Sequence, residues 1–198
     1  MYPNKSLKDY RKPFFYFISI LTLIFPFCSW AHPNALLQQG FSQGFLHPLT
    51  GLDHSLAMLS VGLLASQNKK TPPYVFPLCF LTFMLLGGVI GFMKFNLPWI
   101  ELGILLSVFV LGLIMSLPKQ LPATVTAMLI LIFAFCHGHA HGYEMLPSFN
   151  AIYYASGFLL ATLAIHFVGY YLGYWIERQW KWLMSATGVA ILISSFWI

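Results

Sequence analysis

Six long apolar stretches, separated by short polar or proline-containing breaks, make up most of this chain. They lie at about 39–65, 74–93, 98–117, 121–142, 150–175 and 180–197. Each can cross a hydrocarbon core about 30 Å thick, and such a segment must be helical because lipid cannot satisfy an open strand edge. The connections, among them 142–149 and 176–179, are too short for a soluble domain. The pattern predicts an all-α membrane protein, a single bundle of six transmembrane helices.

The composition agrees with a lipid-embedded chain. Hydrophobic residues make up 59% of the sequence and charged residues 8%, whereas soluble domains average about 25% charged residues. The formal charge of +5 comes from basic residues near the N-terminus and at segment ends, so the expected partner is the lipid bilayer and not nucleic acid. The three cysteines have no spacing typical of a disulfide framework or a thiolate metal site. The oligomeric state is left open.

The N-terminus resembles a secretory signal. A basic stretch ending at Lys12 precedes an apolar run over 14–27, which is short for a full span. Small residues at Ser29 and Ala31 then match the positions that a signal peptidase reads. We therefore expect a signal peptide over 1–31 and a mature six-helix transmembrane domain over 32–198 that begins with His32. The alternative is an uncleaved membrane anchor.

The basic residues also predict an orientation, because cytoplasmic loops of membrane proteins carry an excess of lysine and arginine. With the mature N-terminus outside, one side of the membrane receives only Lys94. The cytoplasmic side receives the remaining loop residues, Lys69, Lys70, Lys119, Arg178 and Lys181. We expect a multi-pass protein of the bacterial inner membrane, with the mature N-terminus and the C-terminus on the periplasmic side.

Two short segments concentrate the titratable side chains. The chain has seven histidines and five acidic residues, and segments 47–54 and 137–144 hold five of these histidines and two of these acids. An aspartate at the centre of a membrane helix costs about 2.5–3.5 kcal/mol, and such residues commonly mark ion pathways. Under the predicted topology both segments face the outer half of the membrane. They indicate a site for a cation.

The second segment has the spacing of a helical metal site. His137, His141 and Glu144 are spaced i, i+4 and i+7, so they share a helix face from which His139 points away. Imidazole and carboxylate donors suit divalent nickel, cobalt or zinc. The two glycines of this segment, Gly138 and Gly142, would either let another helix approach closely or let this helix unwind near its end. The alternative is a set of structural histidines that hydrogen-bond between helices.

The first segment suggests a discontinuous helix. Pro48 and Gly51 make a regular helix through His47 doubtful, and a break would bring His47 near Asp53 and His54. Such breaks are common at transporter binding sites. Asp53 would either ligate the ion or orient a ligating imidazole. Alone, the segment is equally compatible with a helix cap and a turn.

Three further residues are weaker candidates. Glu101 either completes the outer site or interacts with the dipole of its own helix. His166, in the fifth apolar stretch, either relays an ion or is a structural histidine. His32 combines an α-amine with an imidazole after cleavage and could capture a divalent ion, or it merely flanks the cleavage site.

The two segments, HPLTGLDH and HGHAHGYE, resemble the motifs of the HupE/UreJ family of nickel/cobalt permeases. The resemblance extends to the signal peptide, the six spans and a histidine in the fifth span. It implies transport of Ni²⁺, and in some members Co²⁺, for hydrogenase or urease maturation, with no permanently bound cofactor. The residues that fall on the two motifs are His47, Asp53, His54, His137, His139, His141 and Glu144.

Two other classes of function remain compatible with the residues. An intramembrane zinc hydrolase would hold its metal with three histidines and activate water with a carboxylate; the sequence has no HExxH motif, which excludes one form of it. A metal sensor or chaperone would bind without transporting. The sequence has no P-loop pattern, so ATP is not expected to drive the protein directly. We expect a permease and not an enzyme.

Overall fold

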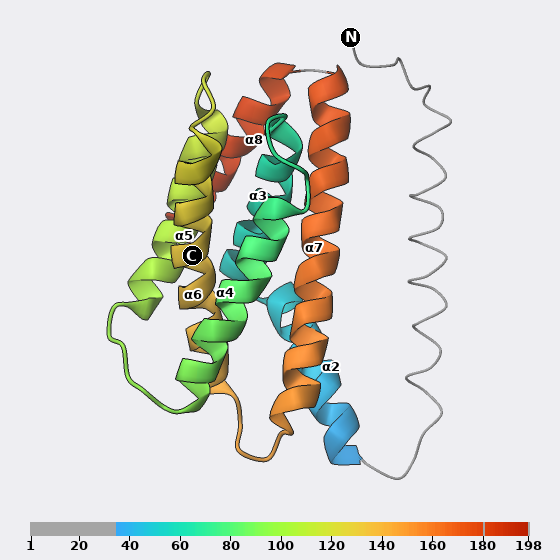
Figure 1. Ribbon diagram of the computed structural model, residues 1–198, viewed down its shortest axis with the longest axis vertical. Coiled ribbons are helices and arrows are strands. Elements are labelled where there is room, and N and C mark those ends of the chain that lie inside the picture. The colour runs from blue at the N-terminus through green and yellow to red at the C-terminus, as the bar shows by residue number, and fades with distance from the viewer. Residues whose placement is uncertain (1–34, 180, 198) are drawn as a thin grey trace.

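The computed structural model of the protein describes residues 35–179 and 181–197, and within them all regular secondary structure is helical (Figure 1). This confirms the all-α prediction. The predicted signal peptide, its cleavage site and His32 lie outside the described residues. The helices are α2 (Ala35–Thr50), α3 (Leu52–Gln67), α4 (Val75–Phe92), α5 (Ile100–Ser116), α6 (Ala123–Glu144), α7 (Ala151–Gln179) and α8 (Lys181–Ser194).

Several of these helices have the length and composition of membrane spans. Helices α4, α6 and α7 can each cross a bilayer, and α2 with α3 forms a fourth candidate, bent by 79°. Helices α5 and α8 are apolar but shorter, at 17 and 14 residues. The chain is therefore a multi-pass membrane protein. The number of six spans stays a prediction.

The predicted connection over 176–179 is wrong, because α7 continues to Gln179. The polar residues there do not end the helix. The Oε2 atom of Glu177 lies 2.6 Å from the Nζ atom of Lys69, which follows α3. Helix α6 also runs to Glu144, two residues beyond the predicted stretch. Polar residues at the end of a span can remain helical, so hydropathy marked the apolar core of each helix and not its end.

Helix α3 lies at the centre of the bundle. All but one of the residues from Ala57 to Ser66 are buried, and α3 packs against α4, α5 and α7. Helices α2 and α3 lie along successive halves of α7, and α4 lies beside α6 (Figure 1). The first turn of α3 is less buried, with Leu52 69% exposed, but it carries the buried side chain of His54.

The α4–α6 contact depends on glycines, as the sequence predicted. A Cβ atom placed at Gly138 would lie 1.9 Å from the carbonyl oxygen of Met84, and one at Gly142 would lie 2.1 Å from that of Gly88. From the other side, a Cβ atom at Gly91 would lie 2.0 Å from the carbonyl oxygen of His139. Small residues let the backbones of membrane helices touch. This contact fixes the position of the histidine-rich end of α6.

Replacing Gly138 with alanine should therefore destabilise the protein. The added methyl group meets backbone of α4, which cannot rotate away, so we expect a loss of about 1–3 kcal/mol, typical of overpacking. Thermal unfolding of the detergent-purified protein measures the loss. Gly88→Ala is the matched control, because its methyl group would meet only the carbonyl oxygen of Gly138, at an ordinary 3.5 Å. Equal unfolding temperatures for the two variants would contradict this account of the contact.

Candidate metal site

The break between α2 and α3 positions the first histidine segment. Helix α2 passes through His47 and Pro48 and ends at Thr50, so the doubt about a regular helix through His47 was wrong. The chain leaves the helix at Gly51, whose backbone is extended (φ −86°, ψ 117°). A proline φ angle suits a helix although its nitrogen cannot donate, and α2 therefore continues beyond it for two residues.

Side-chain hydroxyl groups donate to two carbonyl groups at the end of α2. The Oγ1 atom of Thr50 donates to the carbonyl oxygen of His47 at 3.0 Å, and the Oγ atom of Ser55 donates to that of Pro48 at 2.6 Å. Because buried backbone polar groups must be paired, these bonds stabilise the bend. The bend places His47 and His54 with 6.1 Å between their ring centroids, the proximity that a broken helix predicted.

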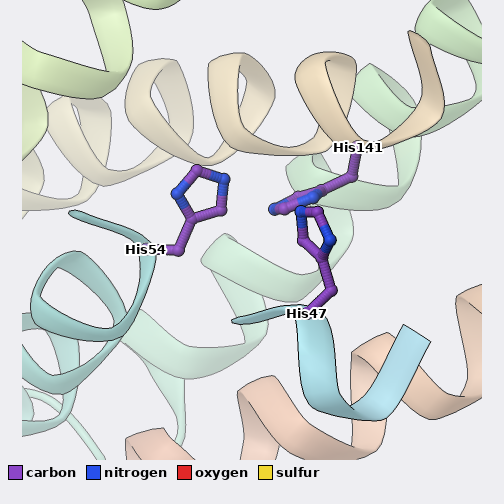
Figure 2. A group of neighbouring side chains, drawn as sticks. All are labelled: His47, His54 and His141. Carbon is purple, nitrogen blue, oxygen red and sulfur yellow. The ribbon is translucent and has the colours of Figure 1, made fainter. Parts of the chain in front are cut away.

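Helix α6 adds its histidines from the opposite side. The ring centroid of His141 lies 4.6 Å from that of His47 and 4.4 Å from that of His54. The ring of His137, one turn earlier on α6, lies 4.8 Å from that of His54. Figure 2 shows how the rings of His47, His54 and His141 converge from three different helices. Residues separated by almost a hundred positions thus form one cluster.

The cluster has the dimensions of a divalent-cation site. One ligand nitrogen from each of His47, His54 and His141 lies within 4.8 Å of the other two. Nitrogens bound to one tetrahedral ion would lie about 3.4 Å apart, given metal–nitrogen distances of about 2.0–2.1 Å. Small side-chain movements would close the group around an ion.

Unsatisfied nitrogens make the same site favourable for a cation. Both ring nitrogens of His141 are buried and have no hydrogen-bond partner among the described residues, and the same holds for Nδ1 of His137. An unpaired buried polar atom costs about 1–3 kcal/mol. A cation that accepts these lone pairs would remove part of that cost.

Asp53 contacts a histidine of the cluster rather than its centre. Its Oδ1 atom accepts a hydrogen bond from the backbone N–H of His54 at 2.9 Å. The same oxygen lies 2.8 Å from Nδ1 of His54, in close contact but without hydrogen-bond alignment. A carboxylate beside one imidazole nitrogen typically orients the ring and leaves the other nitrogen for a metal. Of the two roles open to Asp53, this geometry favours orientation of His54.

Glu144 lies at the exposed side of the cluster. Its Oε2 atom is 3.9 Å from Nε2 of His47, and its side chain is 61% exposed. It shares the helix face of His137 and His141, as the spacing predicted. Its position suits the first contact with a hydrated cation.

His139 points away from the cluster, as the helical spacing predicted. Its Nε2 atom is 2.8 Å from the carbonyl oxygen of Phe95, in the connection between α4 and α5. In the same connection Lys94, which has a positive φ of 61°, donates from Nζ to the carbonyl oxygen of Tyr143. These bonds hold the connection against the last turn of α6.

The two remaining candidates lie apart from the three convergent rings. Glu101 is exposed on the first turn of α5 and forms no hydrogen bond or ion pair with a described residue. His166 is buried on α7, and neither of its ring nitrogens has a hydrogen-bond partner among the described residues. The ring of Phe80 contacts both His137 and His166, with its centroid 6.0 Å from that of His137 and 5.0 Å from that of His166.

Sequence reasoning missed several residues that surround the cluster. Phe158 of α7 has its ring centroid 4.0 Å from that of His141, and Tyr154 lies 6.5 Å from His47 by the same measure. Ser107 of α5 contacts His137 at 2.9 Å. A serine in the middle of an apolar helix was the available signal for Ser107. No such signal marked Tyr154 and Phe158 in the sequence, because α7 contains many aromatic residues along its whole length.

The chain matches known proteins over both histidine segments. The family described as HupE / UreJ protein matches residues 20–198. Protein HupE of Rhizobium leguminosarum bv. viciae is 38% identical over 151 residues, which cover 76% of this chain and 78% of that protein. No solved structure matches the chain. The protein therefore belongs to the HupE/UreJ family.

Proposed function

We propose that the protein is a permease of the bacterial inner membrane that imports Ni²⁺, and with lower preference Co²⁺, for the maturation of hydrogenase or urease. The proposal is carried by one observation, the graded burial of the candidate ligands. Side-chain exposure falls from 61% at Glu144 to 37% at His47 and 11% at His54. His141 is 3% exposed and His137 is fully buried.

A graded row of ligands suits transport. A cation can exchange its water shell for carboxylate and imidazole donors one at a time, so no step removes all of its ligands. A hydrolase instead requires a closed metal site with one open position for water. The row also points toward the buried His166, beyond Phe80. These features support movement through the bundle over reaction at a fixed centre.

The ends of the bundle support import. The basic residues Lys69, Lys119 and Arg178 lie in or beside the α3–α4, α5–α6 and α7–α8 connections, at one end of the bundle (Figure 1). Glu144 and the α4–α5 connection with Lys94 lie at the other end. The positive-inside rule places the basic end in the cytoplasm. The exposed side of the cluster, where Glu144 lies, then faces the periplasm.

The donor set and the family together support the choice of metal. Imidazole with carboxylate suits nickel, cobalt and zinc alike, so the cluster alone does not rank them. The motifs resemble those of nickel/cobalt permeases, and all the residues that carry the resemblance, apart from His139, lie in or beside the cluster. We therefore place nickel first, and cobalt as a competitor.

Radiolabelled nickel uptake tests the proposal directly. Cells that lack their own nickel transporters should accumulate nickel above the empty-vector level when they express the protein, and excess cobalt should reduce the uptake. The purified protein should also bind nickel in a calorimetric titration. Binding without uptake would instead identify a sensor or chaperone. If the protein shows no nickel binding and no nickel uptake, the proposal is overturned.

A further inference from the structure

A buried hydrogen bond joins α5 to the deepest histidine of the cluster. The Oγ atom of Ser107 lies 2.9 Å from Nε2 of His137, and both residues are fully buried. The same Oγ atom lies 2.6 Å from the carbonyl oxygen of Ile104, one turn earlier on α5. Ser107 therefore connects the cluster to a helix that contributes none of the three convergent rings.

The two contacts define the direction of the bonds. A hydroxyl group has one proton to donate, and a carbonyl oxygen can only accept. Ser107 therefore donates to Ile104 and accepts from the Nε2–H group of His137. A neutral imidazole carries one proton, so the proton at Nε2 leaves a lone pair on Nδ1.

Nδ1 of His137 is therefore the ring nitrogen whose lone pair is available to a metal ion. It is buried and has no hydrogen-bond partner among the described residues, while the ring centroid lies 4.8 Å from that of His54. We propose that Ser107 is a positioning residue that fixes the Nε2–H tautomer of His137 and thereby makes Nδ1 a fourth imidazole donor for the cation. The inference rests on the proposed function, because it takes the cluster to bind metal.

Loss of the hydroxyl group would act through His137. Its Nε2–H group would then have no acceptor, and Nδ1 has no partner either, so the preference for the Nε2–H tautomer is lost and part of the protein carries the ring proton on Nδ1. A protonated Nδ1 cannot bind a cation. Residues that orient metal-binding histidines typically contribute 10–100-fold to metal affinity, and we expect about that loss here.

An isosteric pair of variants isolates the hydroxyl group. Ser107→Thr keeps it and Ser107→Val replaces it with a methyl group of the same shape. In titrations of the detergent-purified proteins with Ni²⁺, the threonine variant should retain the affinity within about threefold and the valine variant should lose about 10–100-fold. Thermal unfolding of both verifies that they are equally folded. If the larger side chains of these two variants prevent folding, Ser107→Ala is used instead. It removes the hydroxyl group without adding an atom and should show the same loss of affinity as the valine variant.

A second readout reports the tautomer without any metal. In the ¹⁵N-histidine spectrum of the metal-free protein, assigned with His137→Gln, His137 should be protonated at Nε2, and the valine variant should shift toward protonation at Nδ1. Equal nickel affinity in the threonine and valine variants, or protonation at Nδ1 in the unaltered protein, overturns the role of Ser107. Absence of nickel binding by the unaltered protein instead overturns the proposed function.

Discussion

Replacing His141 with alanine is expected to abolish nickel uptake at limiting nickel while the protein still inserts into the membrane. His141 contacts the rings of both His47 and His54, with its centroid 4.6 Å from that of His47 and 4.4 Å from that of His54. Without it, no imidazole lies between the rings of His47 on α2 and His54 on α3, whose centroids are 6.1 Å apart. Loss of a residue that merely orients a metal ligand costs 10–100-fold in affinity, so loss of a ligand should reduce uptake by at least about 100-fold. His54→Ala should have the same effect.

His139→Ala provides the matched control. It removes the same side chain two positions away on the same helix, but from the opposite face, where His139 contacts the carbonyl oxygen of Phe95. We expect its uptake to stay within a few-fold of the unaltered protein. Immunoblots of membrane fractions verify that all three variants are present in equal amounts. Near-normal uptake by both His141→Ala and His54→Ala would show that the cluster is not part of the transport path.

The sequence predicted those features that depend on local spacing. The apolar runs located the helices within a few residues, and the i, i+4 spacing placed His137 and His141 on one face of α6 with His139 on the other. Pro48 and Gly51 predicted a break, since one removes a donor and the other leaves a helix at little steric cost. The glycines at 138 and 142 predicted either a close approach of another helix or an unwound helix end; the first is found, with α4 as the partner, and α6 stays helical to Glu144.

Features that depend on contacts between helices could not be predicted in the same way. The break falls at Gly51 and not at His47, and the hydroxyl groups of Thr50 and Ser55 donate to the carbonyl groups of His47 and Pro48 at the end of α2. The contact of Ser107 with His137 spans 30 positions, and no periodic pattern connects the two residues. Residue type identified the candidate ligands. Which of them converge is decided by the packing of α2 and α3 against α7 and of α6 against α4.

Nickel accumulation is expected to follow the membrane potential and to require no ATP. A potential of 100 mV, negative inside, favours inward movement of one charge by about 2.3 kcal/mol and of a divalent ion by about 4.6 kcal/mol. At about 1.4 kcal/mol per factor of ten, this supports an equilibrium accumulation of about three decades. A passage lined by imidazoles and one exposed carboxylate can use this gradient directly if the ion carries the whole transported charge.

Right-side-out membrane vesicles without nucleotide test this expectation. A potassium diffusion potential imposed with valinomycin should drive labelled nickel inward, and each increase of about 100 mV should raise the final ratio of inside to outside nickel by about three decades until leaks limit it. Vesicles containing His141→Ala at the same potential control for passive leakage and surface binding. At zero potential the ratio should approach one, because the permease then only equilibrates nickel. Accumulation at zero potential upon addition of ATP would show a different energy source, since the ion itself would gain nothing by moving inward.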